Sequence, residues 1–187
     1  DWRWVIDVNL MSVVYGAQVF VPIMKAQKEG GHVMNVSSIA GMKGFSFAGP
    51  YCATKAAVVS LSESWRAEFE NKNISVSVFC PGFVKSRIYD SKRNRHDRFG
   101  GPVFFEDRLK EKPRLAVQKE IVTTGIDTEI AANRALEGLL NGEFYIFSHP
   151  HFHATIDERC AELKTAFKTA HDSPALETVP KTGLILK

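Results

Sequence analysis

The chain has 187 residues, of which 44% are hydrophobic and 24% charged, and its formal net charge is +3. This length suits a single domain, 1–187, and the composition is that of a globular protein rather than a disordered one. The charge is too small and too dispersed to indicate a nucleic-acid partner. Cys52, Cys80 and Cys160 are widely spaced, so we interpret them as reduced thiols of a cytoplasmic protein. We expect neither a signal peptide nor a membrane-spanning segment.

The chain opens with helices and leads into a strand. Residues 1–9 have helical spacing, and residues 11–28 are apolar nearly all round, which predicts a helix that is buried or forms an interface. Pro22 should kink this helix or lie where the freed carbonyl has another partner. Gly30-Gly31 ends the helix, and the largely apolar residues 32–37 read as a strand.

The same alternation of helix and strand continues along the chain. A helix over 51–71 and an alternating strand over 74–79 follow, and Pro81-Gly82 stops that strand. Further on, Asp127 should cap a helix over 128–141, and a last strand should cover 144–147. Apolar strands between helices are typical of a buried parallel sheet. The predicted fold class is therefore α/β, with a Rossmann-like, doubly wound parallel sheet.

A long mixed segment, residues 83–123, separates the second of these strands from the capped helix. It combines a basic run at 92–98 with four aromatic residues, namely Phe83, Phe99, Phe104 and Phe105. A connection of this length in a compact domain is usually functional or mobile. A solvated helix with a few aromatic anchors explains the same pattern, and both interpretations stay open.

The end of the chain carries alternate imidazoles at His149, His151 and His153. Because no carboxylate or thiol lies beside them in a ligating pattern, we predict no metal site. An amphipathic helix over 156–170 should follow, and we expect the tail, 171–187, to be loose.

The residues most informative about chemistry are Ser38, Tyr51 and Lys55. Tyr51 and Lys55 are four apart at the start of a predicted helix, so their side chains share one face. Ser38 follows a predicted strand, at the carboxyl edge of the sheet, where ligands bind in open α/β folds. A tyrosine has a pKa of about 10 in water, and a nearby ammonium favours its ionised form. Ser38 could then hold a substrate oxygen while Tyr51 moves a proton.

The pattern Ser38-x12-Tyr51-x3-Lys55, with Asn35-Val-Ser before it and Cys80-Pro-Gly-Phe-Val84 after it, resembles the short-chain dehydrogenase/reductase family. The resemblance implies a Rossmann fold and hydride transfer between NAD or NADP and a carbonyl/alcohol pair. The amino-terminal βαβ units of that family, with their glycine-rich turn for the pyrophosphate, have no counterpart in this chain. The residue that distinguishes NAD from NADP would lie in those units.

The resemblance also implies a role for individual residues. Tyr51 would be the general acid/base, and Lys55 would lower its pKa and hydrogen-bond the nicotinamide ribose. Ser38 would position the substrate oxygen, and Asn9 would hold a water that links Lys55 to solvent. The cofactor would further contact the turn after the second strand, at Pro81, Gly82, Val84 and Ser86. The segment 83–123 occupies the position of the family's substrate lid, with Phe83, Phe99, Phe104 and Phe105 as candidate substrate contacts.

Within the family, the chain is similar to bacterial dehydrogenases that act on benzylic alcohols of aryl ethers, which suggests a bulky, apolar or aromatic alcohol or ketone. The resemblance also implies a homodimer or homotetramer built on helices 11–28 and 51–71. Two other classes stay open, a non-catalytic dimerisation or binding fragment and an isomerase or lyase of the related extended family. The intact Ser38 spacing and the Pro-Gly turn favour the dehydrogenase over the isomerase or lyase.

Overall fold

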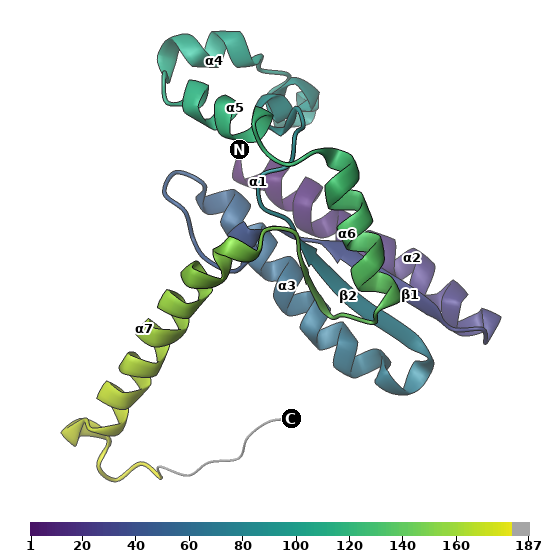
Figure 1. Ribbon diagram of the computed structural model, residues 1–187, viewed down its shortest axis with the longest axis vertical. Coiled ribbons are helices and arrows are strands. Elements are labelled where there is room, and N and C mark those ends of the chain that lie inside the picture. The colour runs from purple at the N-terminus through teal and green to yellow at the C-terminus, as the bar shows by residue number, and fades with distance from the viewer. Residues whose placement is uncertain (181–187) are drawn as a thin grey trace. The chain divides into compact units, whose positions relative to one another are not determined.

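The computed structural model describes residues 1–180, which fall into two units, Asp1–Pro150 and the residues from His151 onward. The second unit contains α7 (His153–His171) and a short helical turn at Pro174–Leu176, and residues 181–187 of the tail that we expected to be loose lie outside the described part. In the first unit the helices and strands are α1 (Trp2–Ile6), α2 (Ser12–Gln27), β1 (Gly31–Val36), α3 (Gly49–Phe69), β2 (Ile74–Cys80), α4 (Phe105–Glu111), α5 (Leu115–Thr123), α6 (Thr128–Leu140) and β3 (Tyr145–Phe147) (Figure 1).

The three strands form one parallel sheet in the order β1-β2-β3. In the central strand β2, every residue except Ser75 is buried, as expected for a strand that helices cover on both faces. Gly31 lies opposite Ile74 and Val78 lies opposite Tyr145, so all three strands end at the same edge. The predicted α/β class with a doubly wound parallel sheet is confirmed.

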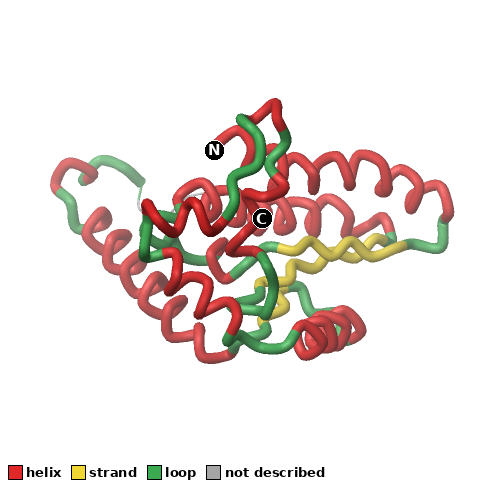
Figure 2. Tube along the Cα trace, turned by 90° about the horizontal axis from the view of Figure 1, so that it is seen from above, coloured by secondary structure: helices red, strands yellow, loops and turns green. Residues whose placement is uncertain are grey.

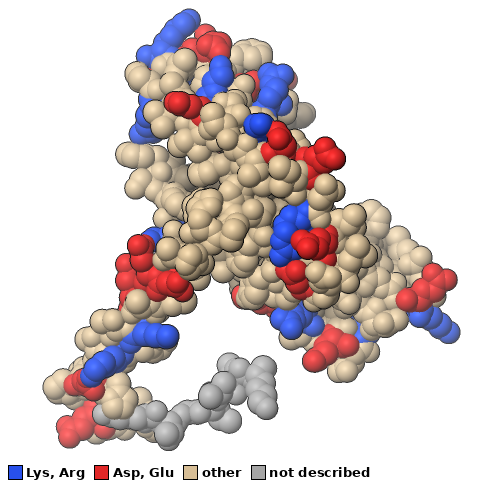
Figure 3. Space-filling view, in the orientation of Figure 1, with Lys and Arg blue, Asp and Glu red and all other residues tan. Residues whose placement is uncertain are grey.

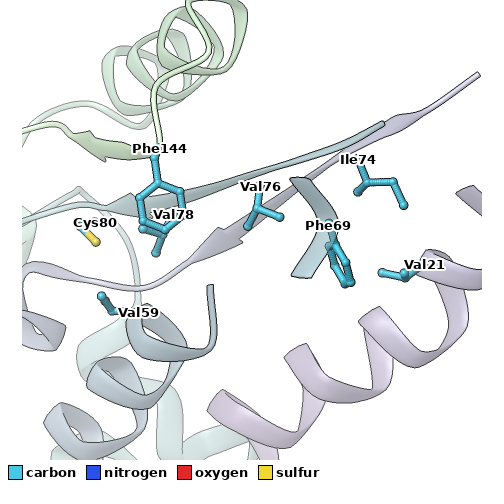
Figure 4. Packing of buried hydrophobic residues seen from close by; sticks show 8 residues of the cluster. All are labelled: Val21, Val59, Phe69, Ile74, Val76, Val78, Cys80 and Phe144. Atoms are coloured by element: carbon cyan, nitrogen blue, oxygen red, sulfur yellow. The ribbon is translucent and has the colours of Figure 1, made fainter. Parts of the chain in front are cut away.

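Helices cover both faces of the sheet (Figures 1 and 2). On one face, Val21 of α2 and both Val59 and Phe69 of α3 pack against β2, in the cluster shown in Figure 4. On the other face, Ala131 and Ala135 of α6 pack against the sheet. This arrangement fixes α3, and hence its first turns, beside the carboxyl end of β1.

Several boundaries differ from the sequence-based expectation. The helix predicted over 51–71 spans Gly49–Phe69. Asp127 is the N-cap residue of α6 by position, but its carboxylate accepts a hydrogen bond from Lys85 Nζ at 2.6 Å instead of capping the helix. The helix predicted over 156–170 begins earlier, at His153.

The first helix differs most from its expected environment. Trp2–Ile6, a π-helical stretch at Asp7–Met11 and α2 follow one another as one helical rod, of which Val21 is the one buried residue within the described chain. Large apolar side chains along it, including Tyr15, Val19, Phe20 and Ile23, are 50–59% exposed. The alternative in which this helix is buried within the chain is therefore wrong, and the interface alternative stays a prediction.

This rod also corrects the expectation that no segment could cross a membrane. Trp2–Gln27 has 26 residues with a hydropathy of 1.5 in its most apolar stretch, so its length and composition alone would allow it to span a bilayer. Length and composition also fit a helix that covers a sheet. Here Val21 packs into the core cluster with β2, and Asn9 hydrogen-bonds Thr54 of α3.

The segment 83–123 contains more regular structure than its sequence suggested. Short 3-10 turns at Ile88–Asn94 and Asp97–Phe99 lead into α4 and α5. Basic and acidic side chains are mixed over the surface of α4 and α5 (Figure 3). The segment is thus a small helical layer with its own packing, which we call the lid segment from here on.

Candidate active site

Ser38 lies at the carboxyl edge of the sheet because the chain stays paired after the strands end. Ser37 N donates to Phe79 O at 2.8 Å, and Ile39 N donates to Pro81 O at 2.9 Å. Ser38 itself is buried and is the N-cap residue of a 3-10 turn, Ile39–Gly41, where its Oγ accepts a hydrogen bond from Ala40 N at 3.1 Å. Its hydroxyl also lies 3.4 Å from Pro81 O. These contacts hold the side chain in place.

Tyr51 and Lys55 come from the first two turns of α3, which starts with Pro50 in its first turn, where proline's missing N–H costs nothing. The hydroxyl of Ser38 lies close enough to the side chain of Tyr51 to lower the pKa of the phenol. Lys55 Nζ donates to Val36 O at 2.9 Å and lies 5.9 Å from the centroid of the Tyr51 ring. The structure therefore brings together the three residues that the sequence singled out.

The electrostatics differ from the simple expectation that Lys55 lowers the pKa of Tyr51. Burial raises the pKa of the Tyr51 phenol above its ordinary value, and the Ser38 hydroxyl opposes that rise. Burial likewise lowers the pKa of the Lys55 ammonium. Burial is therefore the largest influence on both pKa values, because desolvation disfavours the charged form of each group.

Asn9 lies in the π-helical stretch Asp7–Met11, the kind of local widening that is frequent at functional sites. Its Nδ2 lies 3.3 Å from Thr54 Oγ1, and Thr54 Oγ1 in turn donates to Tyr51 O at 2.9 Å. The side chain of Asn9 thus ties the first helix to the turn of α3 that carries Tyr51. Its expected role in a proton path stays a prediction.

The turn after β2 contains the other expected cofactor contacts. Gly82 N donates to His149 Nδ1 at 3.2 Å, which ties this turn to the end of β3. Val84 pairs with Ile126, and the two hydrogen bonds of that bridge, Ile126 N to Phe83 O and Lys85 N to Ile126 O, flank Val84 on either side. The N–H and C=O groups of Val84 therefore point away from Ile126.

Ser86 and the four phenylalanines occupy different environments. Ser86 is exposed, and its Oγ lies 3.4 Å from Ile88 N. Phe83 and Phe104 are 43% and 59% exposed and Phe99 is half-buried, whereas Phe105 is only 3% exposed. The Phe105 ring packs edge-on against Tyr89 at 5.0 Å. Its burial argues against the expected contact with substrate and makes Phe105 a packing residue of the lid segment.

The sequence did not point to three features of this region. His149 holds the Pro-Gly turn, although we considered it only as a metal ligand. Arg114, in the lid segment, lies with its Cζ 4.1 Å from the ring centroid of Phe47, in the loop between Ser38 and Tyr51. Ser37 hydrogen-bonds the backbone of Lys55. Only the place of Ser37 beside Ser38 could have signalled such a role.

Cavities and metal ligands add little to this site. An open hollow of about 350 Å³ lies away from Ser38 and Tyr51, and its lining residues are Asp1, Arg3, Trp4, Asp7, Arg98 and Phe99. Among residues 1–180, no group of three or more histidine, cysteine or acidic side chains could hold a metal ion. The predicted absence of a metal site stays a prediction.

Comparison with known proteins gives consistent matches. Residues 1–97, which include Ser38, Tyr51 and Lys55, match the family model "short chain dehydrogenase". A "CLA biosynthesis dehydrogenase/reductase" of Lactiplantibacillus plantarum is 30% identical over 88% of this chain and 59% of its own length. A "C alpha-dehydrogenase" of a Sphingobium species is 35% identical over 84% of this chain and 53% of its own.

Among solved structures, a short chain dehydrogenase/reductase from Burkholderia phymatum in complex with NAD superimposes with a TM-score of 0.79 at 32% identity. That match covers 89% of this chain and 59% of the Burkholderia chain. The chain therefore spans between half and three-fifths of the length of these relatives.

Proposed function

This chain belongs to the short-chain dehydrogenase family, and on that premise we propose that it carries the acid/base centre of an enzyme that moves a hydride between NAD or NADP and a carbonyl/secondary-alcohol pair. One observation carries the proposal. The Ser38 hydroxyl lies beside the Tyr51 phenol, close enough to lower its pKa, at the carboxyl edge of the sheet, with Lys55 one turn further along the same helix. In an open α/β sheet this edge is where ligands bind.

The nicotinamide cofactor supplies or accepts the hydride when it is bound, and the residues of this edge fit it. Val84 turns its backbone N–H and C=O away from the Ile126 ladder, so they would serve as donor and acceptor for a nicotinamide carboxamide. Lys55 uses one of its three N–H donors on Val36 O, which leaves donors for ribose hydroxyls. Pro81, Gly82 and Ser86 lie in the same turn, and the Burkholderia relative was solved with NAD.

The proton chemistry falls to this chain's own side chains. Tyr51 gives its phenolic proton to a carbonyl oxygen during reduction, or takes the proton of an alcohol during oxidation. Ser38 hydrogen-bonds the same oxygen and fixes its place. Lys55 stabilises the phenolate through its charge. Asn9, joined to the Tyr51 turn through Thr54, completes the path by which the proton reaches solvent.

The substrate is proposed to be bulky and apolar or aromatic. The exposed rings of Phe83 and Phe104 support this, because an aromatic-lined site favours apolar ligands. The relative called C alpha-dehydrogenase, at 35% identity, agrees with a benzylic alcohol. We further propose a cytoplasmic homo-oligomer, in which the exposed apolar side chains of α2 are covered by a second copy together with α3.

The proposal is tested on the full-length protein that contains this chain. The protein is incubated with NAD or NADP and with one of three classes of alcohol: benzylic alcohols of aryl ethers, long-chain hydroxy acids or short aliphatic alcohols. Formation of the reduced cofactor is followed by absorbance. We expect reduction with at least one bulky alcohol, and its loss in Ser38→Ala but not in Ser60→Ala, an exposed serine of α3. A full-length protein that neither reduces nor binds the cofactor would overturn the proposal.

A further inference from the structure

Three consecutive residues at the end of β1 each make one hydrogen bond to α3. Asn35 Nδ2 donates to Ser62 Oγ at 2.9 Å. The next residue, Val36, accepts from Lys55 Nζ at 2.9 Å through its carbonyl, and Ser37 Oγ donates to Lys55 O at 2.8 Å. Side chains at 51, 55 and 62 share one face of the helix, so this row runs along the face that holds the catalytic tyrosine.

The two serines and the asparagine of this row are withdrawn from water. Asn35 is 7% exposed, Ser37 2% and Ser62 not at all. Ser62 Oγ in turn donates a hydrogen bond to Val58 O at 2.7 Å, so the buried hydroxyl is both donor and acceptor. Buried polar groups cost stability relative to an apolar core, which suggests that this row serves to fix a geometry.

The region around Ser37 leaves little room for movement. A side chain at Gly41 would come within 2.6 Å of Ser37 Oγ and 2.7 Å of Lys55 O, so the 3-10 turn after Ser38 lies directly against the Ser37–Lys55 bond. The thiol of Cys80 lies close enough to the Ser37 side chain and the Ser38 backbone for both to lower its pKa. Strand, turn and helix therefore meet at one hydroxyl.

We propose that Asn35, Ser37 and Ser62 are positioning residues, which set the spacing between Ser38 on the strand side and Tyr51 with Lys55 on the helix side. This inference rests on the proposed function, because it assigns these residues to the same acid/base step. Ser37 fixes the helix backbone at Lys55, and Asn35 with Ser62 fixes its rotation two turns further along. If either link is lost, the ammonium moves away from the phenol.

The groups that face Lys55 determine the sign of the expected effect. Tyr51 faces it from its own helix, Cys80 from β2 and the Val36 carbonyl from β1. Of these, only Tyr51 takes a proton during the reaction. Moving the ammonium away from the phenol raises the pKa of Tyr51, so alcohol oxidation should require a higher pH.

The test compares Ser37→Ala and Ser62→Ala with Ser60→Ala, the same change at an exposed position of α3, in the full-length protein. We expect the pH at which kcat/KM for alcohol oxidation is half-maximal to rise by about half a unit in the first two variants and not in the control. Thermal unfolding reports any general loss of stability separately.

Each outcome bears on one statement. An unchanged pH profile in a folded, active Ser37→Ala variant would overturn the positioning role while leaving the proposed function intact. If Ser62→Ala does not fold, Ser37→Ala alone still tests the positioning role, because Ser37 lies at the edge of the sheet, where its side chain bonds Lys55 O. An inactive wild-type protein would instead count against the proposed function.

Discussion

The edge that carries Ser38, Tyr51 and Lys55 and the lid segment, 83–123, are built in different ways. At the edge, hydrogen bonds of 2.8–2.9 Å join strand, turn and helix, and most involve backbone groups. The lid segment has two helices, of seven and nine residues, held by a few side chains such as Phe105 and Leu115. Fewer buried contacts imply easier local opening. The comparison indicates a rigid edge around Ser38 and Tyr51 and a lid segment that opens more easily.

The largest effect is expected where the rigid edge is tightest. Gly41→Ala should lower kcat by about 100-fold, because the added methyl would displace Ser37 or the Lys55 backbone and shift the catalytic groups. Gly44→Ala is the matched control, since nothing lies within 4 Å of a side chain there. Steady-state kinetics of both variants test this. Similar activity in the two would show that the edge tolerates movement and that the comparison is wrong.

A smaller, confined effect is expected in the lid segment. Phe105→Ala should destabilise the segment locally by about 3 kcal/mol, because a fully buried ring is removed. Phe104→Ala, at a 59% exposed position, should not. Amide hydrogen exchange should show faster exchange in 83–123 for the first variant, with β1 and α3 unchanged. Faster exchange that spread into α3 would mean that lid segment and edge form one cooperative unit.

The contact between the two regions should matter less again. Arg114→Gln removes the cation over the Phe47 ring, an interaction worth about 0.5–1 kcal/mol at an exposed site. We expect KM to rise by about two- to five-fold at constant kcat. Lys110→Gln removes the same charge four residues away and serves as control. If kcat fell instead of KM rising, Arg114 would act on the reaction step rather than on the lid segment.

The smallest effect concerns the far end of β1. Burial lowers the pKa of His32, whose Nε2 lies 2.9 Å from Ser77 Oγ. A histidine with a lowered pKa in the folded state binds fewer protons than in the unfolded state, so stability is complete above about pH 6.5 and falls as the pH drops below it. Chemical denaturation at pH 7.5 and 5.5 should show a smaller loss of stability in His32→Gln. An equal loss in both proteins would assign the effect to other groups.

The sequence was sufficient for the edge because its signals are local. A strand that ends at Ser38 and a helix that starts near Tyr51 define positions at one edge, and the fold leaves little choice about where they meet. The order of strands and helices followed for the same reason. The boundaries moved by a few residues at α3 and α7, where no strong cap marks the first turn.

The sequence was not sufficient where side chains choose among several partners. Phe105 and Phe104 are neighbours with the same side chain, yet one is buried and the other is exposed, and only the packing of α4 on Tyr89 decides which. The position of Asp127 predicted a helix cap, but its carboxylate accepts a hydrogen bond from Lys85, which lies 42 residues away in the sequence. The net direction of the Tyr51 pKa depended on burial, which no spacing reveals.

The most direct test of the central claim is the turnover of Tyr51→Phe in the full-length protein, measured together with its affinity for the reduced cofactor by fluorescence. The variant removes only the phenolic oxygen, whose pKa the neighbouring Ser38 hydroxyl lowers. Turnover should fall by about 10²–10⁴-fold, with cofactor affinity unchanged. A Tyr51→Phe variant that keeps even about a tenth of the wild-type turnover would show that the proton moves through another group.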